Sequence, residues 1–285
     1  MRIKQRFSGI VAVLRKYPRI PVAIVLLSVF LVCAVLAPWI SPYDPIKIDL
    51  SATYAKPSPQ YFLGTDYIGR DVFSRLIWGT RSTVYSAILS ILFATIIGTL
   101  LGTIAGFFGG YVDTVISRFV DILLTLPAFI IAIVLMGILG RGLINMVVAI
   151  GIGMSPRIAR VARGAALSVK GREYIEAARS YGCSNARILF GHVIPHCLTP
   201  IFVYATLSLG SAVMLESGLS FLGLGIPPPT PTWGKTISEG VDVMRTMPWI
   251  STVAGGCIML LVLGFNLLGD GLRDALDPRM RRQLR

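Results

Sequence analysis

The sequence predicts an all-helical integral membrane protein with six transmembrane helices and both termini in the cytoplasm. Of its 285 residues, 54% are hydrophobic and only 14% are charged, whereas soluble chains carry about 25% charged residues. The apolar residues lie in long stretches that contain no charge. A helix needs about 20 such residues to cross a bilayer, so these stretches are predicted to be spans.

Six apolar ranges provide the predicted helices, each near the length that a span requires. They cover about residues 20–40, 83–108, 115–138, 143–165, 196–216 and 248–269. The fourth has a short uncharged core, Gly142–Pro156. Its helix is therefore expected to continue to Arg163 and to place its arginines in the headgroup region, where Arg side chains snorkel.

The helices define one membrane domain at residues 20–270, with no separate soluble domain. A basic tail at 1–19 precedes it and a second tail at 271–285 follows it. Its three long connecting segments are an external segment at 41–81, a cytoplasmic insert at 166–195 and an external loop at 217–247.

The basic residues orient this domain. With a cytoplasmic N-terminus, that side of the membrane holds 19 Lys and Arg residues, against eight on the other side. This is the positive-inside asymmetry, and it accounts for the net charge of +13 without a nucleic-acid surface. The basic start and first apolar run are similar to a signal peptide, but the run is too long and lacks a cleavage site, so a retained helix is expected.

The second predicted helix carries a stripe of small residues. Four glycines occur at intervals of four: Gly98, Gly102, Gly106 and Gly110. Small residues at this spacing let helix backbones approach closely in a membrane. The stripe fits either packing inside this chain or an interface with another subunit.

Residues 172–195 of the cytoplasmic insert are expected to form two short helices. Glu176 lies early in the first helix, where a carboxylate suits the helix dipole. Gly182 is placed for a left-handed stop, Ser184 can cap the second helix, and Pro195 suits the first turn of the next span. The insert is therefore predicted to project from the membrane domain as a bent pair of helices.

At this insert the sequence resembles the EAA loop of bacterial ABC-importer permeases. The pattern consists of Glu176-Ala177-Ala178, Gly182, Ile188, His192 and Pro195. Further stretches resemble the dipeptide/oligopeptide/nickel group, specifically its second ("C") membrane subunit. These are Leu63-Gly64-Thr65-Asp66 with Gly69-Arg70-Asp71 and Ser74-Arg75; Asp121 with Pro127; Leu219 to Gly225 with Pro231 and Trp233-Gly234; and Phe265-Asn266 with Gly269-Asp270, Leu272-Arg273-Asp274 and Leu276-Asp277-Pro278. The resemblance extends from about residue 20 to residue 280.

The resemblance implies a type I ABC importer permease in the bacterial cytoplasmic (inner) membrane, with partners. These are a homologous permease in a heterodimer, two ATPase subunits that bind ATP and Mg, and an extracytoplasmic solute-binding protein. It also implies that an ATPase groove receives the insert through Tyr174, Glu176, Ala177, Ala178, Arg179, Gly182, Ile188, His192 and Pro195. From the residues alone, an amphipathic helix on anionic lipid stays an alternative.

Several patterns that suggest chemistry are incomplete, so the chain is not expected to be an enzyme. Gly234-Lys235-Thr236 is similar to the end of a phosphate-binding loop, but Pro229 stands where that motif requires Gly. His192 and His196 have the spacing of a zinc pair without the HExxH glutamate. No cofactor or metal is therefore expected in this chain. Arg118 and Asp121 are expected to form a local pair at i and i+3.

Four residues are candidates for the translocation path or an external gate. Glu216 lies near the outer end of the fifth helix, and an ionisable group there either lines the path or sits in the headgroup zone. Ser220 follows it in the same motif. Pro229 ends three prolines expected to form a stiff extended element, and Trp233 is an aromatic suited to an interface or a membrane boundary.

The resemblance makes short peptides the expected cargo, with nickel or metal chelates, opines and oligosaccharides as alternatives. A secondary transporter is the rival from another class. It would require inverted repeats or broken helices near the midplane, and neither pattern is evident in the sequence.

Overall fold

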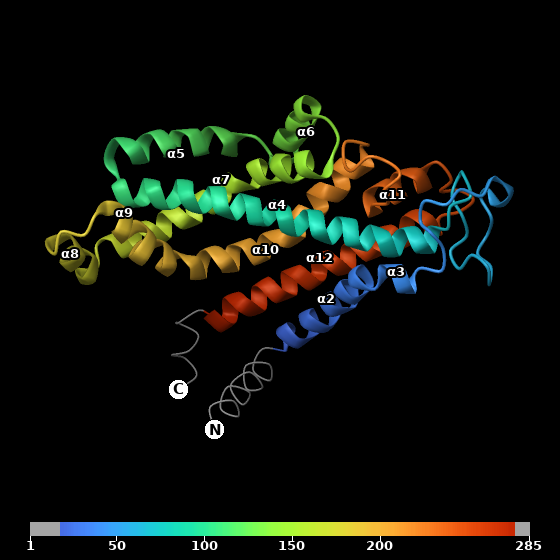
Figure 1. Cartoon of the computed structure of the whole chain (residues 1–285), viewed down its shortest axis with the longest axis horizontal. Coiled ribbons are helices and arrows are strands. Elements are labelled where there is room, and N and C mark those ends of the chain that lie inside the picture. The colour runs from blue at the N-terminus through green and yellow to red at the C-terminus, as the bar shows by residue number, and fades with distance from the viewer. Residues whose placement is uncertain (1–17, 277–285) are drawn as a thin grey trace, which may run out of the picture. The chain divides into compact units, whose positions relative to one another are not determined.

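The structure is a computed structural model that describes residues 18–276, and every regular element in that range is a helix (Figure 1). The elements in order are α2 (Arg19–Val35), α3 (Ala37–Ile40), η1 (Leu50–Ala52), α4 (Val72–Phe108), α5 (Gly110–Thr125), α6 (Ala128–Leu139), α7 (Leu143–Lys170), α8 (Glu173–Ser180), α9 (Asn185–Ile188), η2 (Leu189–Val193), α10 (Ile194–Phe221), α11 (Trp233–Val241) and α12 (Trp249–Leu276). Most of the predicted N-terminal tail and the end of the C-terminal tail lie outside the described residues.

By length and composition, four helices can cross a membrane within the described part of the chain. They are α4, α7, α12 and the continuous helix Asn185–Phe221. A fifth span arises if α5 and α6 are counted together, and α2 is a shorter apolar helix of 17 residues. The all-helical prediction is thus confirmed, whereas the count of six spans stays a prediction.

The prediction of one continuous helix at 115–138 is wrong. The structure breaks it into α5 and α6, which meet at an angle of 92°. Pro127 stands at the break with an extended ψ of 136° and is followed by α6. Proline lacks an N–H and its ring clashes with the preceding turn of a helix, which favours a break at this position, although α7 and α10 continue through Pro156 and Pro200.

Helix α4 begins well before its predicted start at residue 83. Asp71 precedes it and accepts hydrogen bonds from the backbone N–H and the hydroxyl of Ser74, at 2.7 and 2.6 Å. These bonds cap the first turn. Arg75 lies in that turn and is only 3% exposed. Hydropathy treats such a charge as the end of a span, but here the protein buries it.

Two other helices also extend past their predicted ends. Helix α7 continues to Lys170 and α12 to Leu276. The insert predicted at 166–195 is therefore mostly helical, because α9, the π-helical turn η2 and α10 follow one another without a break.

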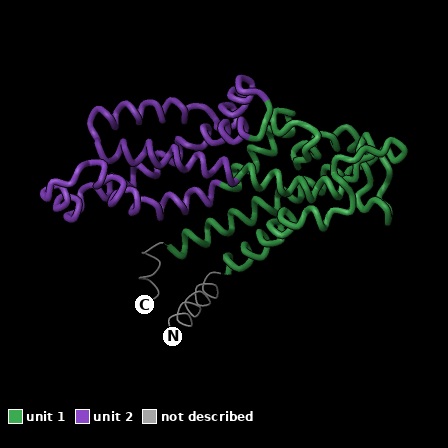
Figure 2. Tube along the Cα trace, in the orientation of Figure 1, with its two compact units in different colours: residues 1–87, 141–143, 209–285 green, residues 88–140, 144–208 purple. Residues whose placement is uncertain are grey.

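The described residues fall into two compact units (Figure 2). Unit 1 contains residues 18–87, 141–143 and 209–276, and unit 2 contains residues 88–140 and 144–208. In unit 1, α2 lies along α12, where Gly264 leaves room for Leu27 and Gly271 for Ile20. Trp233 is fully buried in the same unit, and its ring meets Phe30 edge to face at 5.7 Å.

In unit 2, α4 packs closely on α7 through three of the four predicted glycines (Figure 1). A Cβ at Gly98 would lie 2.8 Å from the Ser155 carbonyl oxygen, and one at Gly106 would lie 2.8 Å from the Arg163 carbonyl oxygen. Gly102 similarly faces Ala159 and Ala162. The stripe thus serves packing within this chain.

Gly110 does not belong to the stripe, which corrects the prediction of four glycines. It is the first residue of α5, has a φ of +53°, and would place a Cβ with nothing within 4 Å. Its neighbour Gly109 also has a positive φ, of +70°. Both glycines serve the turn between α4 and α5, because glycine adopts this backbone region without steric cost.

Candidate functional site

The insert between α7 and α10 is built as the capping residues predict. Gly182 ends α8 with a φ of +75°, and the next N–H, that of Cys183, donates to the Ala178 carbonyl oxygen at 3.1 Å. This is a glycine stop that satisfies the last carbonyls of a helix. The Ser184 hydroxyl then accepts a hydrogen bond from the N–H of Arg187 at 3.4 Å, so Ser184 is the N-cap of α9.

One side of α8 is fixed to the rest of unit 2. Ile175 and Ile188 are fully buried. The Arg179 guanidinium lies 5.5 Å from the ring centre of Phe107 at the end of α4, a cation–π contact. The ring of Tyr174 lies 5.5 Å from that of His196. These contacts set the position of α8 within its unit.

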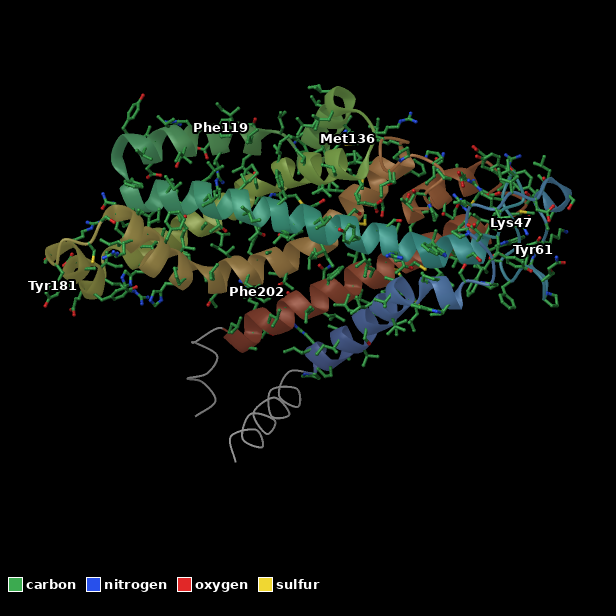
Figure 3. All side chains as sticks on the ribbon, viewed as in Figure 1. Lys47, Tyr61, Phe119, Met136, Tyr181 and Phe202 are labelled. Carbon is green, nitrogen blue, oxygen red and sulfur yellow. The ribbon has the colours of Figure 1, made fainter. Side chains whose placement is uncertain are left out.

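The other side of α8 is exposed. Glu173, Glu176 and Ala177 are exposed to solvent, and Tyr181 beyond the helix end is 89% exposed (Figure 3). This face combines carboxylates, an aromatic side chain and an alanine that permits close approach. It has the composition of a helix that enters a groove of another protein.

The nine predicted coupling residues fall into three groups by exposure. Six of them are exposed (Tyr174, Glu176, Ala177, Arg179, Gly182 and Pro195), although Tyr174 and Arg179 also make the contacts that hold α8 in its unit, while Ala178 and His192 are half-buried. Ile188 is buried, so it cannot contact a partner and is instead a packing residue of the insert. The spacing of these residues in the sequence did not show which of them would be buried, because they lie on short helices.

Two ion pairs join α5 to α7 in unit 2. Arg163 binds Asp113 with two hydrogen bonds of 2.6 Å, and Arg160 binds Asp121 with one of 2.9 Å. The sequence predicted these arginines in the headgroup region and paired Asp121 with Arg118. The pairing with Arg118 is wrong, because α5 lies alongside α7 and brings Asp121 to Arg160, whereas the headgroup placement stays a prediction.

Unit 1 contains a buried ion cluster that the sequence did not predict as a unit. Asp66 binds Arg70 at 2.6 Å and Arg75 at 3.6 Å, and Glu239 of α11 binds both arginines at 3.4 Å. The four side chains are 3–11% exposed. The i, i+4 spacing of Asp66 and Arg70 was the available signal, but nothing in the sequence linked them to Glu239.

The structure changes the interpretation of Glu216. Its side chain is fully buried and accepts hydrogen bonds from the hydroxyls of Ser220 at 2.8 Å and Ser217 at 3.3 Å. The headgroup alternative is therefore wrong. Ser220 is also buried, so the two residues are part of the interior of unit 1.

The external loop differs in two ways from its predicted form. Trp233 is buried rather than placed at an interface, because its indole N–H donates to the Leu76 carbonyl oxygen at 2.9 Å. Pro228 and Pro229, the last two of the three prolines, lie in a turn rather than in an extended element, since proline suits turns as well as extended backbone. Of the four predicted path residues, Pro229 lines an open cavity, of about 550 Å³, together with Trp78.

Comparison with known proteins identifies the family of this chain. Residues 98–282 match the family described as "Binding-protein-dependent transport system inner membrane component", and residues 11–57 match "N-terminal TM domain of oligopeptide transport permease C". Among similar proteins is the di/tripeptide transport system permease protein DppC of Pseudomonas aeruginosa, 41% identical over 90% of this chain and 86% of that protein.

Two further comparisons agree with this match. The glutathione transport system permease protein GsiD of Salmonella typhimurium is 42% identical over 94% of this chain and 89% of its own. A chain from inward-facing structures of the MetNI methionine ABC transporter has the same fold, with a TM-score of 0.58 at 20% identity over 71% of this chain and 96% of that chain. The chain belongs to the family of binding-protein-dependent transport system inner membrane components.

Proposed function

We propose that this chain is one of two membrane subunits of an ATP-driven importer of short peptides in the bacterial inner membrane. Relatives at about 40% identity are named as permeases for dipeptides, tripeptides and glutathione. The six apolar runs support six spans, and the charge distribution supports a cytoplasmic location of both termini. The second membrane subunit is a homologue of this chain.

The observation that carries this proposal is the exposed face of α8. Ile175 and the Arg179–Phe107 contact fix the helix, while Glu176 and Ala177 face outward. A rigidly mounted helix transmits the motion of a bound partner to the elements beneath it. Two separate ATPase subunits, which bind ATP and Mg, are the partners proposed for this face.

The importer works by alternating access. A solute-binding protein delivers the peptide on the external side, and closure of the ATPase subunits moves α8 and switches the opening of the membrane domain. The residues of this chain perform no covalent chemistry. Gly234-Lys235-Thr236 lie in the first turn of α11, but Pro229 stands where a phosphate-binding loop requires Gly.

A charge reversal on α8 tests the proposal. Glu176→Lys should insert normally into the membrane, lose co-purification of the ATPases, and abolish ATP-dependent dipeptide uptake by the full transporter, because it presents the wrong charge to a basic groove. Asp242→Lys, an equal reversal at the exposed end of α11, is the matched control and should keep the ATPases bound. Undiminished co-purification with Glu176→Lys would remove the docking role.

A further inference from the structure

A cavity of about 420 Å³ lies between α4, α5 and α7 within unit 2. Its volume falls in the range of small-molecule sites. Small residues such as Gly102 and Ala159 line one part, and Ile116 and Val120 of α5 give it an apolar wall. Asp121, Arg160 and Arg163 also line it, so a charged pair stands beside an apolar surface.

The two ion pairs at this cavity differ in strength and exposure. Asp113 accepts two hydrogen bonds from Arg163 and a third from the Ser117 hydroxyl, at 3.0 Å, and its side chain is 18% exposed. The Arg160–Asp121 pair has one contact, with side chains 61% and 45% exposed. Because an exposed pair contributes little to stability, Arg160 and Asp121 can exchange partners at low cost.

The balance of charge indicates the class of ligand. Both arginines at the cavity already bind a carboxylate, so a simple anion finds no uncompensated positive charge. A ligand with one ammonium and one carboxylate group can pair with both members of the exposed ion pair at once, its ammonium with Asp121 and its carboxylate with Arg160. Arginine can bind the carboxylate of such a ligand through two parallel hydrogen bonds. A short peptide is a ligand of this kind, and its two charged termini are close together because each residue of an extended chain spans at most about 3.6 Å.

We propose that this cavity is a transit site for zwitterionic short peptides, in which Asp121 accepts the N-terminal ammonium and Arg160 binds the C-terminal carboxylate. Ile116 and Val120 contact the peptide side chains, and the Arg163–Asp113 pair keeps α5 on α7 while the exposed pair opens. The site rests on the proposed import of peptides and places a point of cargo contact in this chain.

A substitution at Gly164 can fill the cavity without changing any charged residue. It lines the cavity, and a Cβ built on it meets no atom within 4 Å. In the purified full transporter without its binding protein, Gly164→Phe should weaken binding of radiolabelled alanyl-phenylalanine at least tenfold. Gly164→Ala should leave binding unchanged.

The charged residues have their own variants and control. Arg160→Gln and Asp121→Asn should each weaken binding at least tenfold, whereas Arg157→Gln should not, because Arg157 is exposed one turn away on α7 and lies outside the cavity lining. N-acetylated and C-amidated forms of the peptide should compete at least tenfold less well than the free peptide. Wild-type affinity in Gly164→Phe or in both charge variants would overturn the site.

A double exchange separates cargo binding from simple helix pairing. Asp121→Arg combined with Arg160→Asp keeps an ion pair between α5 and α7, so a purely structural pair would restore binding and uptake. We expect no restoration, and recovery would overturn the proposal. A lipid could occupy the cavity instead. If added phosphatidylglycerol displaces the peptide in a concentration-dependent way, and Arg160→Gln abolishes the binding of that lipid, the cavity is a lipid site and the proposal is overturned.

Failure of the site and failure of the function give different results. If the wild-type transporter imports the dipeptide with ATP while the cavity variants bind and import as well as wild type, the site is wrong and the proposed function stands. If the wild-type transporter with its binding protein imports no peptide, the proposed function itself is wrong.

Discussion

Trp233 donates its indole N–H to the Leu76 carbonyl oxygen at 2.9 Å, across 157 residues of sequence. The bond attaches α11 to the first turns of α4. The same carbonyl also accepts the Thr80 hydroxyl at 3.1 Å, so it keeps a partner when Trp233 is replaced. We predict that Trp233→Phe lowers the free energy of unfolding by about 2 kcal/mol or more, because it removes one hydrogen bond and leaves a smaller ring in a fully buried site.

Thermal unfolding of the purified chain in detergent measures this effect. Trp39→Phe is the matched control, because that side chain is 77% exposed and should leave the melting temperature unchanged. Equal shifts in both variants would show that the buried bond contributes nothing specific.

The buried cluster around Glu239 supports a second prediction. Glu239→Met leaves Arg70 and Arg75 with Asp66 as their shared carboxylate partner. Breaking a buried ion pair on one side typically costs about 3–5 kcal/mol, and we expect destabilisation of that order in an unfolding experiment.

Restoring the charge balance should recover part of this loss. In the double variant Arg75→Met with Glu239→Met, one positive and one negative charge disappear together and the Asp66–Arg70 pair remains. Apolar replacement of a whole buried pair is often neutral, so the double variant should be more stable than Glu239→Met alone. A double variant that is less stable than the single one would contradict the account.

The glycines of α4 give a third prediction. A Cβ at Gly102 would collide with the Ala159 carbonyl oxygen and approach Ala162 to 2.7 Å. We expect Gly102→Ala to destabilise the protein by about 1–3 kcal/mol through overpacking. Gly164→Ala on α7 is the control, and it should be neutral or stabilising by up to about 1 kcal/mol, because alanine is the better helix former.

Far-UV circular dichroism during heating measures both glycine variants. A melting temperature for Gly102→Ala at or above that of wild type would mean that α4 and α7 separate without cost, and the stripe would then have no packing role.

The sequence predicted features that depend on local chemistry. Apolar runs identified the helices, and Gly182 and Ser184 identified the turn and cap of the insert, because a glycine stop and a serine cap depend on a few neighbouring residues. The exposure of Glu176 also followed from the amphipathic pattern of α8.

Features that depend on tertiary contacts were missed or misassigned. No partner was predicted for Arg163, because Asp113 lies 50 residues away in the sequence. Trp233 was placed at an interface because its carbonyl partner lies on another helix. Polar and aromatic side chains can be buried or exposed according to partners that spacing does not reveal.

The break between α5 and α6 also determines what can surround this chain. Leu126 at the break is extended and 51% exposed, and the Thr125 hydroxyl satisfies the Ile122 carbonyl oxygen at 2.7 Å. In hydrocarbon, each backbone group left without a hydrogen bond costs several kcal/mol, so irregular backbone is tolerated only against protein or water. At hydrocarbon depth, acyl chains could not solvate such a corner, and another protein surface or water would have to cover Leu126.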